Sequence, residues 1–390
     1  MEILEELPLL LFGGFLLAGY VAHSIGSRTH IPRVILLLLL GIAAGPSALN
    51  LVPGSALAWF PIASQAALSV IGFELGEKFL GSKLKHVGKS LLILSLTKVL
   101  GAALIVFLVL ILFDTPLVIA LILAGIAPAT APAATADVIF ESKAQGRLTD
   151  TTLRLVAIDD AWGVILFSIV LAIAAATAGD SSTSSLLLAG WREIIGALLL
   201  GALLGLPMAI ITGRVSAGEL TLIEALGFVF VCGGLATAMG LSYILACMSM
   251  GAVVSNVARH HTRPFHAIKN VRQPFLVIFF LLAGYHTDLS AVGTLGLLSV
   301  LYIGARSIGV IFACNLGARL AGLPSIVRSH IGWCMLPQAG VALGLALLAA
   351  QRFPEQGGQV LSIVVGTCLF FEIAGPLLTR MALRHAGEIR

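Results

Sequence analysis

Two adjacent acidic residues, Asp159 and Asp160, lie inside an apolar stretch that runs from Leu153 to Ala174. A carboxylate in the middle of a membrane span costs on the order of several kcal/mol when it is charged and unpaired. Acidic residues inside such spans therefore mark ion or proton pathways. The pair predicts a site within a membrane at which a monovalent cation or a proton binds.

Two sets of three unusual residues recur along the chain at similar spacing. Each set has a basic residue, a proline and an acidic residue in three successive apolar stretches: Lys98, Pro128 and Asp160, then Arg306, Pro337 and Glu372. With the N-terminus outside, as the loop charges described below indicate, the first set starts from the cytoplasmic side and the second from the outside. This arrangement predicts two inverted repeats, with a site where the repeats meet. We expect Lys98 and Glu372 to form an ion pair that closes this centre.

Prolines interrupt two of the apolar stretches. Pro128 and Pro132 remove backbone donors from LAGIAPATAPAATADVIF, and Pro337 does the same in GWCMLPQAGVALG. Freed carbonyls within a membrane must face protein or a wet cavity, and those at the ends of half-helices favour cations. Thr130 and Thr135 could add hydroxyl oxygens. We therefore expect two broken helices that cross near the middle of the membrane and form a cation site.

The composition is typical of a polytopic membrane protein. Hydrophobic residues make up 58% of the 390 residues and charged residues 11%, whereas a soluble domain carries about 25% charged residues. Stretches of about 20 apolar residues cross a bilayer. Thirteen such stretches are present, at 7–25, 31–49, 59–79, 90–112, 117–139, 152–175, 186–212, 219–239, 241–258, 271–287, 291–318, 326–350 and 358–381. The expected fold class is an all-α membrane protein with about 13 transmembrane helices.

Positive charge is distributed unevenly between the loops. With the N-terminus outside, 19 of the 23 Lys and Arg residues fall in cytoplasmic loops, and the exceptions are Lys98, Arg192, Arg306 and Arg352. Short cytoplasmic loops retain positive charge, so we expect the N-terminus outside and the C-terminus in the cytoplasm. Basic residues confined to such loops do not indicate nucleic-acid binding. Five cysteines without metal-type spacing lie in apolar stretches: Cys232, Cys247, Cys314, Cys334 and Cys368. The motifs HExxH and GxSxG are absent, and we expect no enzyme.

These motifs resemble the monovalent cation:proton antiporter superfamily, on the side of the NapA- and NhaA-like sodium/proton antiporters. The resemblance lies in APATAPAATADVIF, VAIDDAWGVILFS, FFLLAGYHTDLS, the arginine of IGARSIGV, and MLPQAGVALGLAL. It implies an NhaA-like fold, a homodimer and a bacterial inner membrane with its lipids as surroundings. It also implies a division into scaffold or dimerisation helices at 1–89 and 215–290, core helices at 90–180 and 291–390, and a linker helix at 181–214.

The resemblance further implies roles for single residues. Asp160 matches the carboxylate that carries the cation and the proton, and Asp159 matches the one that pairs with the basic residue of the eleventh span, here Arg306. Thr130 falls at the crossing point of the first broken helix. Electrogenic relatives carry lysine in place of Arg306, and an arginine keeps its charge.

The expected function is antiport of a monovalent cation, Na⁺ or Li⁺, against protons by alternating access, without a cofactor and in the service of pH homeostasis. A proton or a cation at Asp160 neutralises the core and lets it cross. The fixed charge of Arg306 predicts one proton per cation, and hence electroneutral exchange. The alternatives are a K⁺/H⁺ antiporter, a Kef-like potassium efflux channel and a Na⁺-coupled symporter of an organic anion.

Overall fold

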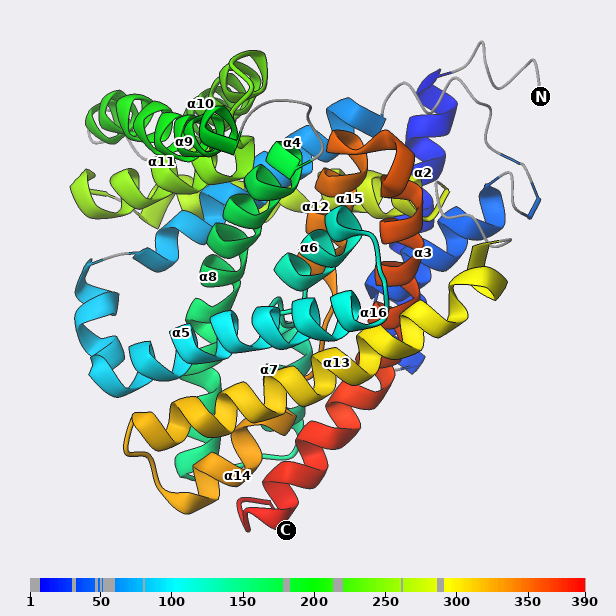
Figure 1. Cartoon of the computed structure of the whole chain (residues 1–390). Helices are drawn as coiled ribbons and strands as arrows, with labels where there is room; N and C mark the ends of the chain where they lie inside the picture. Colours follow the sequence, from blue (N-terminus) through cyan, green and yellow to red (C-terminus); the bar gives the residue numbers. More distant parts are fainter. Residues whose placement is uncertain are drawn as a thin grey trace. The chain divides into compact units, whose positions relative to one another are not determined.

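The computed structural model describes residues 8–29, 33–45, 48–49, 51, 60–79, 81–177, 183–212, 220–260, 262–285 and 291–389. In these ranges the chain forms helices joined by turns and short loops, and no strand (Figure 1). The backbone contacts divide into two units, residues 1–79 with 193–293 and residues 80–192 with 294–390. The chain passes from the second unit back to the first within helix α9 (Thr183–Thr212).

The first unit contains helices that pack closely through glycine. They are α2 (Pro8–Thr29), α3 (Arg33–Ala44), α4 (Phe60–Gly76), the short η2 (Glu77–Phe79), α10 (Leu220–Ala238), α11 (Tyr243–Val257) and α12 (Thr262–Tyr285). A Cβ added to Gly41 of α3 would lie 2.1 Å from the carbonyl oxygen of Leu281 in α12. A Cβ added to Gly251 of α11 would lie 2.2 Å from that of Phe73 in α4. Small residues let membrane helices approach this closely, since packing replaces the hydrophobic drive of water.

The second unit contains four long helices and two pairs of short ones. The long helices are α5 (Gly81–Leu112), α8 (Arg147–Thr177), α13 (Ala291–Leu320) and α16 (Pro354–His385). The short pairs are α6 (Leu117–Ile126) with α7 (Pro132–Glu141), and α14 (Ser325–Cys334) with α15 (Gly340–Arg352). Each pair replaces one predicted apolar span, so the expectation of two broken helices is confirmed.

The two breaks, at residues 127–131 and 335–339, follow from the prolines within and beside them. Pro132 stands in the first turn of α7, where its missing N–H costs no helical bond. Pro128 and Pro337 lie in the breaks themselves. The two breaks meet, because the backbone N–H of Ala131 donates to the carbonyl oxygen of Pro337 at 2.8 Å. The crossing of two interrupted helices is thus held by a backbone hydrogen bond.

Several helices extend beyond the apolar stretches expected from the sequence. Helix α5 begins at Gly81, but Gly88 has φ +69° and interrupts it just before the expected span. Such a φ favours glycine, which explains the kink.

By length and composition, seven helices in the described part of the chain are apolar enough to cross a membrane, or eight if the bent α12 is one span. The count of thirteen spans stays a prediction.

The residues after α16 close over the start of α8. The Glu388 carboxylate accepts hydrogen bonds from the backbone N–H of Leu148 at 2.7 Å and of Thr149 at 2.8 Å, and from the Thr149 hydroxyl at 2.7 Å. The backbone N–H of Gln145 donates to the Glu388 carbonyl oxygen. A carboxylate at this position satisfies amides that have no helical acceptor and opposes the helix dipole. Glu388 is therefore the N-terminal cap of α8, supplied from the other end of the unit.

We expect Glu388→Ala to lower the stability of the protein by about 1–2 kcal/mol, because three donors at the start of α8 lose their acceptor. The thermal unfolding temperature in detergent measures the effect. Asp150→Ala is the matched control, since Asp150 is an exposed acidic residue in the same first turn with no contact to Glu388. An equal loss in both variants would mean that charge at the helix start, and not the cap, is responsible.

Candidate functional site

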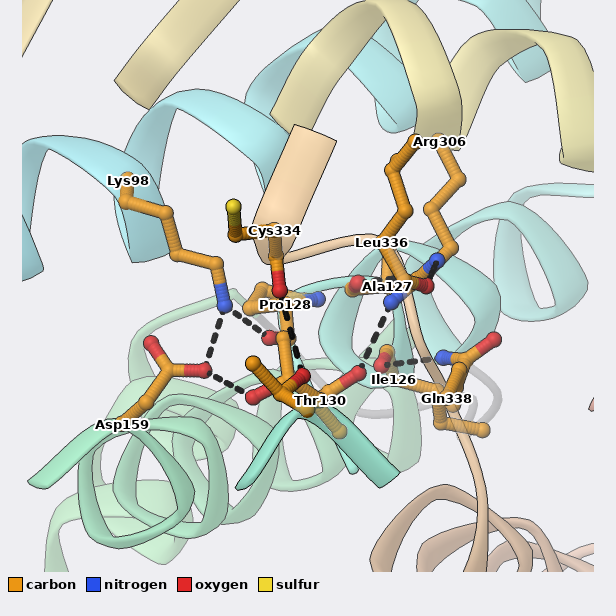
Figure 2. A network of polar contacts seen from close by, with 12 residues as sticks. Lys98, Ile126, Ala127, Pro128, Thr130, Asp159, Arg306, Cys334, Leu336 and Gln338 are labelled. Carbon is orange, nitrogen blue, oxygen red and sulfur yellow. Dashed lines mark hydrogen bonds and ion pairs between the residues drawn. The ribbon is translucent and has the colours of Figure 1, made fainter. Parts of the chain in front are cut away.

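The centre of the second unit contains a buried ion pair. The ammonium group of Lys98 on α5 lies 2.5 Å from Asp159 Oδ2 on α8, and both side chains are completely buried. Lys98 also donates to the carbonyl oxygen of Pro128 in the first break. The Thr130 hydroxyl donates to the same Asp159 oxygen at 2.7 Å. Figure 2 shows Lys98 and Thr130 converging on this one oxygen of Asp159.

The second oxygen of Asp159 has no hydrogen-bond partner among the described residues, although it is buried. A buried carboxylate oxygen without a donor carries a desolvation cost that a bound cation would relieve. The other oxygen of Asp159 accepts from Lys98 and Thr130, and Lys98 is held in turn by the Pro128 carbonyl. The second oxygen of Asp159 is therefore a position in the described part of the chain at which a small cation could be coordinated.

The predicted pairing of the buried charges is wrong. Lys98 pairs with Asp159 and not with Glu372, and no ion pair joins Arg306 to Asp159. The reason is the shape of the donors. A lysine ammonium can turn toward one carboxylate and one carbonyl, whereas the planar fork of an arginine presents five donors and fits a set of carbonyls around it.

Arg306 on α13 joins the two breaks. Its Nε donates to the Ala127 carbonyl oxygen at 2.9 Å and its Nη2 to that of Ala129 at 3.0 Å. Its Nη1 donates to the Leu336 carbonyl oxygen at 2.7 Å. The guanidinium also lies 4.3 Å from the centre of the Phe371 ring. Arg306 therefore satisfies carbonyls that the breaks release from both helices, as Figure 2 shows for Ala127 and Leu336.

The remaining predicted residues are distributed differently. The Thr135 hydroxyl donates to the Cys334 carbonyl oxygen at 3.1 Å, so it links the two broken helices and does not face Asp159. Glu372 on α16 is buried, and its Oε2 has no hydrogen-bond partner among the described residues. The structure describes the backbone of Asp160, which lies within α8, but its side chain lies outside the described part.

Sequence reasoning missed Gln338 in the second break. Its side-chain nitrogen donates to the Ile126 carbonyl oxygen at 3.3 Å and lies 3.4 Å from the Tyr302 hydroxyl oxygen. It is completely buried, so it adds one more link between the end of α6 and the second break. Its position next to Pro337 was the available signal, because a polar side chain beside a break can replace a lost backbone donor.

Among the described side chains, no three His, Cys, Asp or Glu residues gather as they would around a multi-ligand metal ion. The chemistry of the centre is instead that of one carboxylate, one ammonium, one hydroxyl and several carbonyls. Such a set offers oxygen atoms of the kind that a monovalent cation or a proton binds.

Comparison with known proteins identifies the family of the chain. The family model for the transmembrane part of sodium/hydrogen exchangers matches residues 12–384. The ammonium/H⁺ antiporter subunit AmhT of Alkalihalophilus pseudofirmus is 26% identical over 340 residues, which cover 87% of this chain and 85% of AmhT. The sodium/proton antiporter MjNhaP1 of Methanocaldococcus jannaschii at pH 8 superposes with a TM-score of 0.76 at 21% identity, over 98% of this chain and 99% of MjNhaP1.

A second MjNhaP1 structure, from an electron microscopy map, gives a TM-score of 0.68 at 21% identity over 99% of both chains. The expected all-helical membrane fold with two broken helices is therefore confirmed. The resemblance to cation:proton antiporters is confirmed as well, because the matched family covers nearly the whole chain. The chain belongs to the sodium/hydrogen exchanger family and is an integral membrane cation/proton antiporter.

Proposed function

We propose that the protein exchanges Na⁺ or Li⁺ for protons at Asp159 and Asp160. The observation that carries this proposal is the buried Asp159 carboxylate, one oxygen of which is held by Lys98 and Thr130 while the other has no hydrogen-bond partner among the described residues. Asp160 follows on the same helix and carries the proton or the cation. Thr130 and the free oxygen of Asp159 supply further ligands, and no resident cofactor takes part.

Competition at one place couples the two flows. A proton or a cation on Asp160 leaves the group of Asp159, Asp160 and Lys98 with no net charge. With neither bound, the group carries one negative charge, which is costly to move through an apolar environment. The core moves its site across the membrane when a proton or a cation is bound, and it does not do so when the site is empty. This rule is sufficient for alternating access.

The counter-charge in this scheme is Lys98, in place of the Arg306 that the sequence suggested. The carbonyl of Pro128 gives the ammonium of Lys98 a second acceptor, so the ammonium is held beside the carboxylates by two contacts. Arg306 keeps its charge in both states because it is bound to three carbonyls and does not take part in the exchange. One proton per cation follows.

We expect electroneutral exchange in liposomes that contain only this protein. A Na⁺ gradient should move protons without a transport current, and the proton flux should not change when the membrane potential is clamped to zero with K⁺ and valinomycin. Solid-supported membrane recordings measure the current directly. A current that reverses at the potential expected for two protons per Na⁺ would contradict the scheme and assign the second proton to Lys98.

We expect Thr130→Val to raise the KM for the cation several-fold with a smaller effect on the maximal rate. The variant keeps the volume of the side chain but removes the hydroxyl that donates to Asp159 and that could face a cation. Thr130→Ser is the matched control, since it keeps the hydroxyl. Proton flux measured against Na⁺ concentration separates the two parameters. An equal KM for the cation in Thr130→Val and Thr130→Ser would show that the Thr130 hydroxyl does not contribute to the site.

The wider setting is part of the same proposal. The second unit contains both breaks and the buried ion pair, so it is the mobile core, and the first unit, with its close glycine packing, is the scaffold on which a homodimer forms. The distribution of basic residues favours an N-terminus outside and a C-terminus in the cytoplasm, and the family resemblance favours a bacterial inner membrane. There it would serve pH homeostasis.

The proposal is tested with purified protein in liposomes that contain a pH-sensitive dye. Na⁺, Li⁺, K⁺ and NH₄⁺ are added in turn, and NH₄⁺ is included because AmhT is named as an ammonium/H⁺ antiporter. Liposomes without protein correct for passive entry of ammonia. We expect proton release with Na⁺ and Li⁺ and little with K⁺. Cation flux without proton movement would replace the antiporter with a channel or a symporter, and a response to NH₄⁺ or K⁺ alone would change the substrate.

A further inference from the structure

An open cavity of about 400 Å³ lies at the corner between α13 and α14 in the second unit, away from the breaks. Five polar residues line it: Asn315, Arg319, Ser325, Arg328 and Ser329. The lining thus contains two guanidinium groups and no acidic side chain. This combination points to an anionic ligand.

Neither arginine is neutralised by the described part of the protein. The side chain of Arg319 is exposed and forms no hydrogen bond or ion pair with another described residue. Arg328 lines the cavity and donates from its Nε to the Leu323 carbonyl oxygen at 2.5 Å, while its two terminal nitrogens form no hydrogen bond with the described residues. The Asn315 side-chain nitrogen donates to the Arg328 carbonyl oxygen at 3.2 Å. The two guanidinium groups therefore line the cavity without a counter-ion among the described residues.

The turn between the two helices supplies further donors. Gly322 has φ +67° and ends α13, with its N–H bonded to the Arg319 carbonyl oxygen and the N–H of Leu323 bonded to that of Ala318. The next helix, α14, begins after Pro324 without a side-chain cap. Only from Val327 onward do its backbone N–H groups bond back to Pro324. The amides of the first turn are therefore open to an anion beside the two arginines.

An exposed apolar stripe leads along α13 to this corner. Ile308, Phe312, Leu316 and Leu320 follow one another at intervals of four residues, so they share one face of the helix. They are exposed to 66%, 58%, 41% and 63%. In a membrane protein such a face contacts lipid, and its last residue stands next to Arg319. The cavity thus lies where the apolar surface of α13 ends.

We propose that this cavity binds the phosphate group of an anionic phospholipid, whose acyl chains lie along the α13 stripe. Arginine forks match phosphate oxygens with two parallel hydrogen bonds, and a basic pocket at the end of membrane helices selects lipids with a net negative charge. A free phosphate shares the head-group chemistry but would gain nothing from the apolar stripe. The stripe therefore favours the lipid as the source of the phosphate. This site is independent of the exchange centre at Asp159.

Native mass spectrometry of the purified full chain tests the proposal by counting bound phosphatidylglycerol and phosphatidylcholine over a range of lipid concentrations. We expect phosphatidylglycerol to bind more tightly than phosphatidylcholine. Arg319→Gln should weaken phosphatidylglycerol binding about 10-fold, which corresponds to ~1.4 kcal/mol. Arg319→Lys should lie between the two, because it keeps the charge and loses the fork. Arg319 has no described partner, so these variants should keep the unfolding temperature of the wild type without lipid.

Arg384→Gln is the matched control, since Arg384 is an exposed arginine of the last turn of α16 outside the cavity. Equal losses in Arg319→Gln and Arg384→Gln would overturn the site in favour of unspecific attraction to basic charge. A competition arm with inorganic phosphate distinguishes the source of the phosphate. Displacement of phosphatidylglycerol by millimolar phosphate, sensitive to Arg319, would overturn the assignment to a lipid.

Discussion

Asp160→Asn should reduce Na⁺-driven proton flux in liposomes to the level of liposomes without protein. Asparagine keeps the size of the side chain and removes both the negative charge and the proton that the proposed exchange needs. The group of Asp159 and Lys98 then stays neutral whether or not a cation is present. The variant core should cross the membrane freely but carry nothing, so the loss concerns coupling and not folding.

The companion variant Asp159→Asn should behave differently. It leaves the ammonium of Lys98 without its carboxylate, so we expect loss of transport together with a lower unfolding temperature. For Asp160→Asn the unfolding temperature should stay near that of the wild type. Flux from a pH-sensitive dye and thermal unfolding in detergent provide the two readouts. Proton flux that survives in Asp160→Asn and disappears in Asp159→Asn would move the exchanging proton to Asp159.

The breaks could be predicted from the sequence because their cause is local. Pro128, Pro132 and Pro337 remove backbone donors wherever they stand in a helix, and the structure ends or begins a helix beside each of them. The membrane character is likewise a property of composition. A proline alone does not decide a break, however, since Pro207 and Pro376 lie inside the continuous helices α9 and α16.

The partners of the buried charges could not be predicted in this way. Lys98 and Arg306 precede their prolines by similar distances, so the sequence treats them as equivalent and offers two ways to pair them with acidic residues. The orientation of each helix about its own axis in the second unit decides between these two pairings. It brings Lys98 to Asp159 and surrounds Arg306 with carbonyls from both breaks. The cap formed by Glu388 is a contact between distant segments of the same kind, and no local pattern indicates it.

A double-mutant cycle should reveal the true partner of Asp159. Lys98→Met leaves a buried carboxylate without a counter-charge, and we expect it to lower the free energy of unfolding by about 3–5 kcal/mol. Adding Asp159→Asn should recover most of this loss, because the remaining amide is uncharged. Replacing both members of a buried pair by neutral groups is often far less costly than removing one. The coupling energy between positions 98 and 159 should therefore exceed about 1 kcal/mol.

Arg306→Met should be as destabilising for a different reason, and Asp159→Asn should not relieve it. The variant leaves the carbonyls of Ala127, Ala129 and Leu336 without a donor, at a cost of about 1–3 kcal/mol for each buried acceptor. None of these acceptors is the carboxylate, so the coupling between positions 306 and 159 should be clearly smaller than the coupling between positions 98 and 159. Unfolding by denaturant in detergent gives the four free energies of each cycle. A large coupling at 306 and 159 with none at 98 and 159 would restore the pairing suggested by the sequence. It would also make arginine the counter-charge of the exchange centre, in place of the Lys98 ammonium whose contacts to Asp159 and Pro128 support the scheme proposed above.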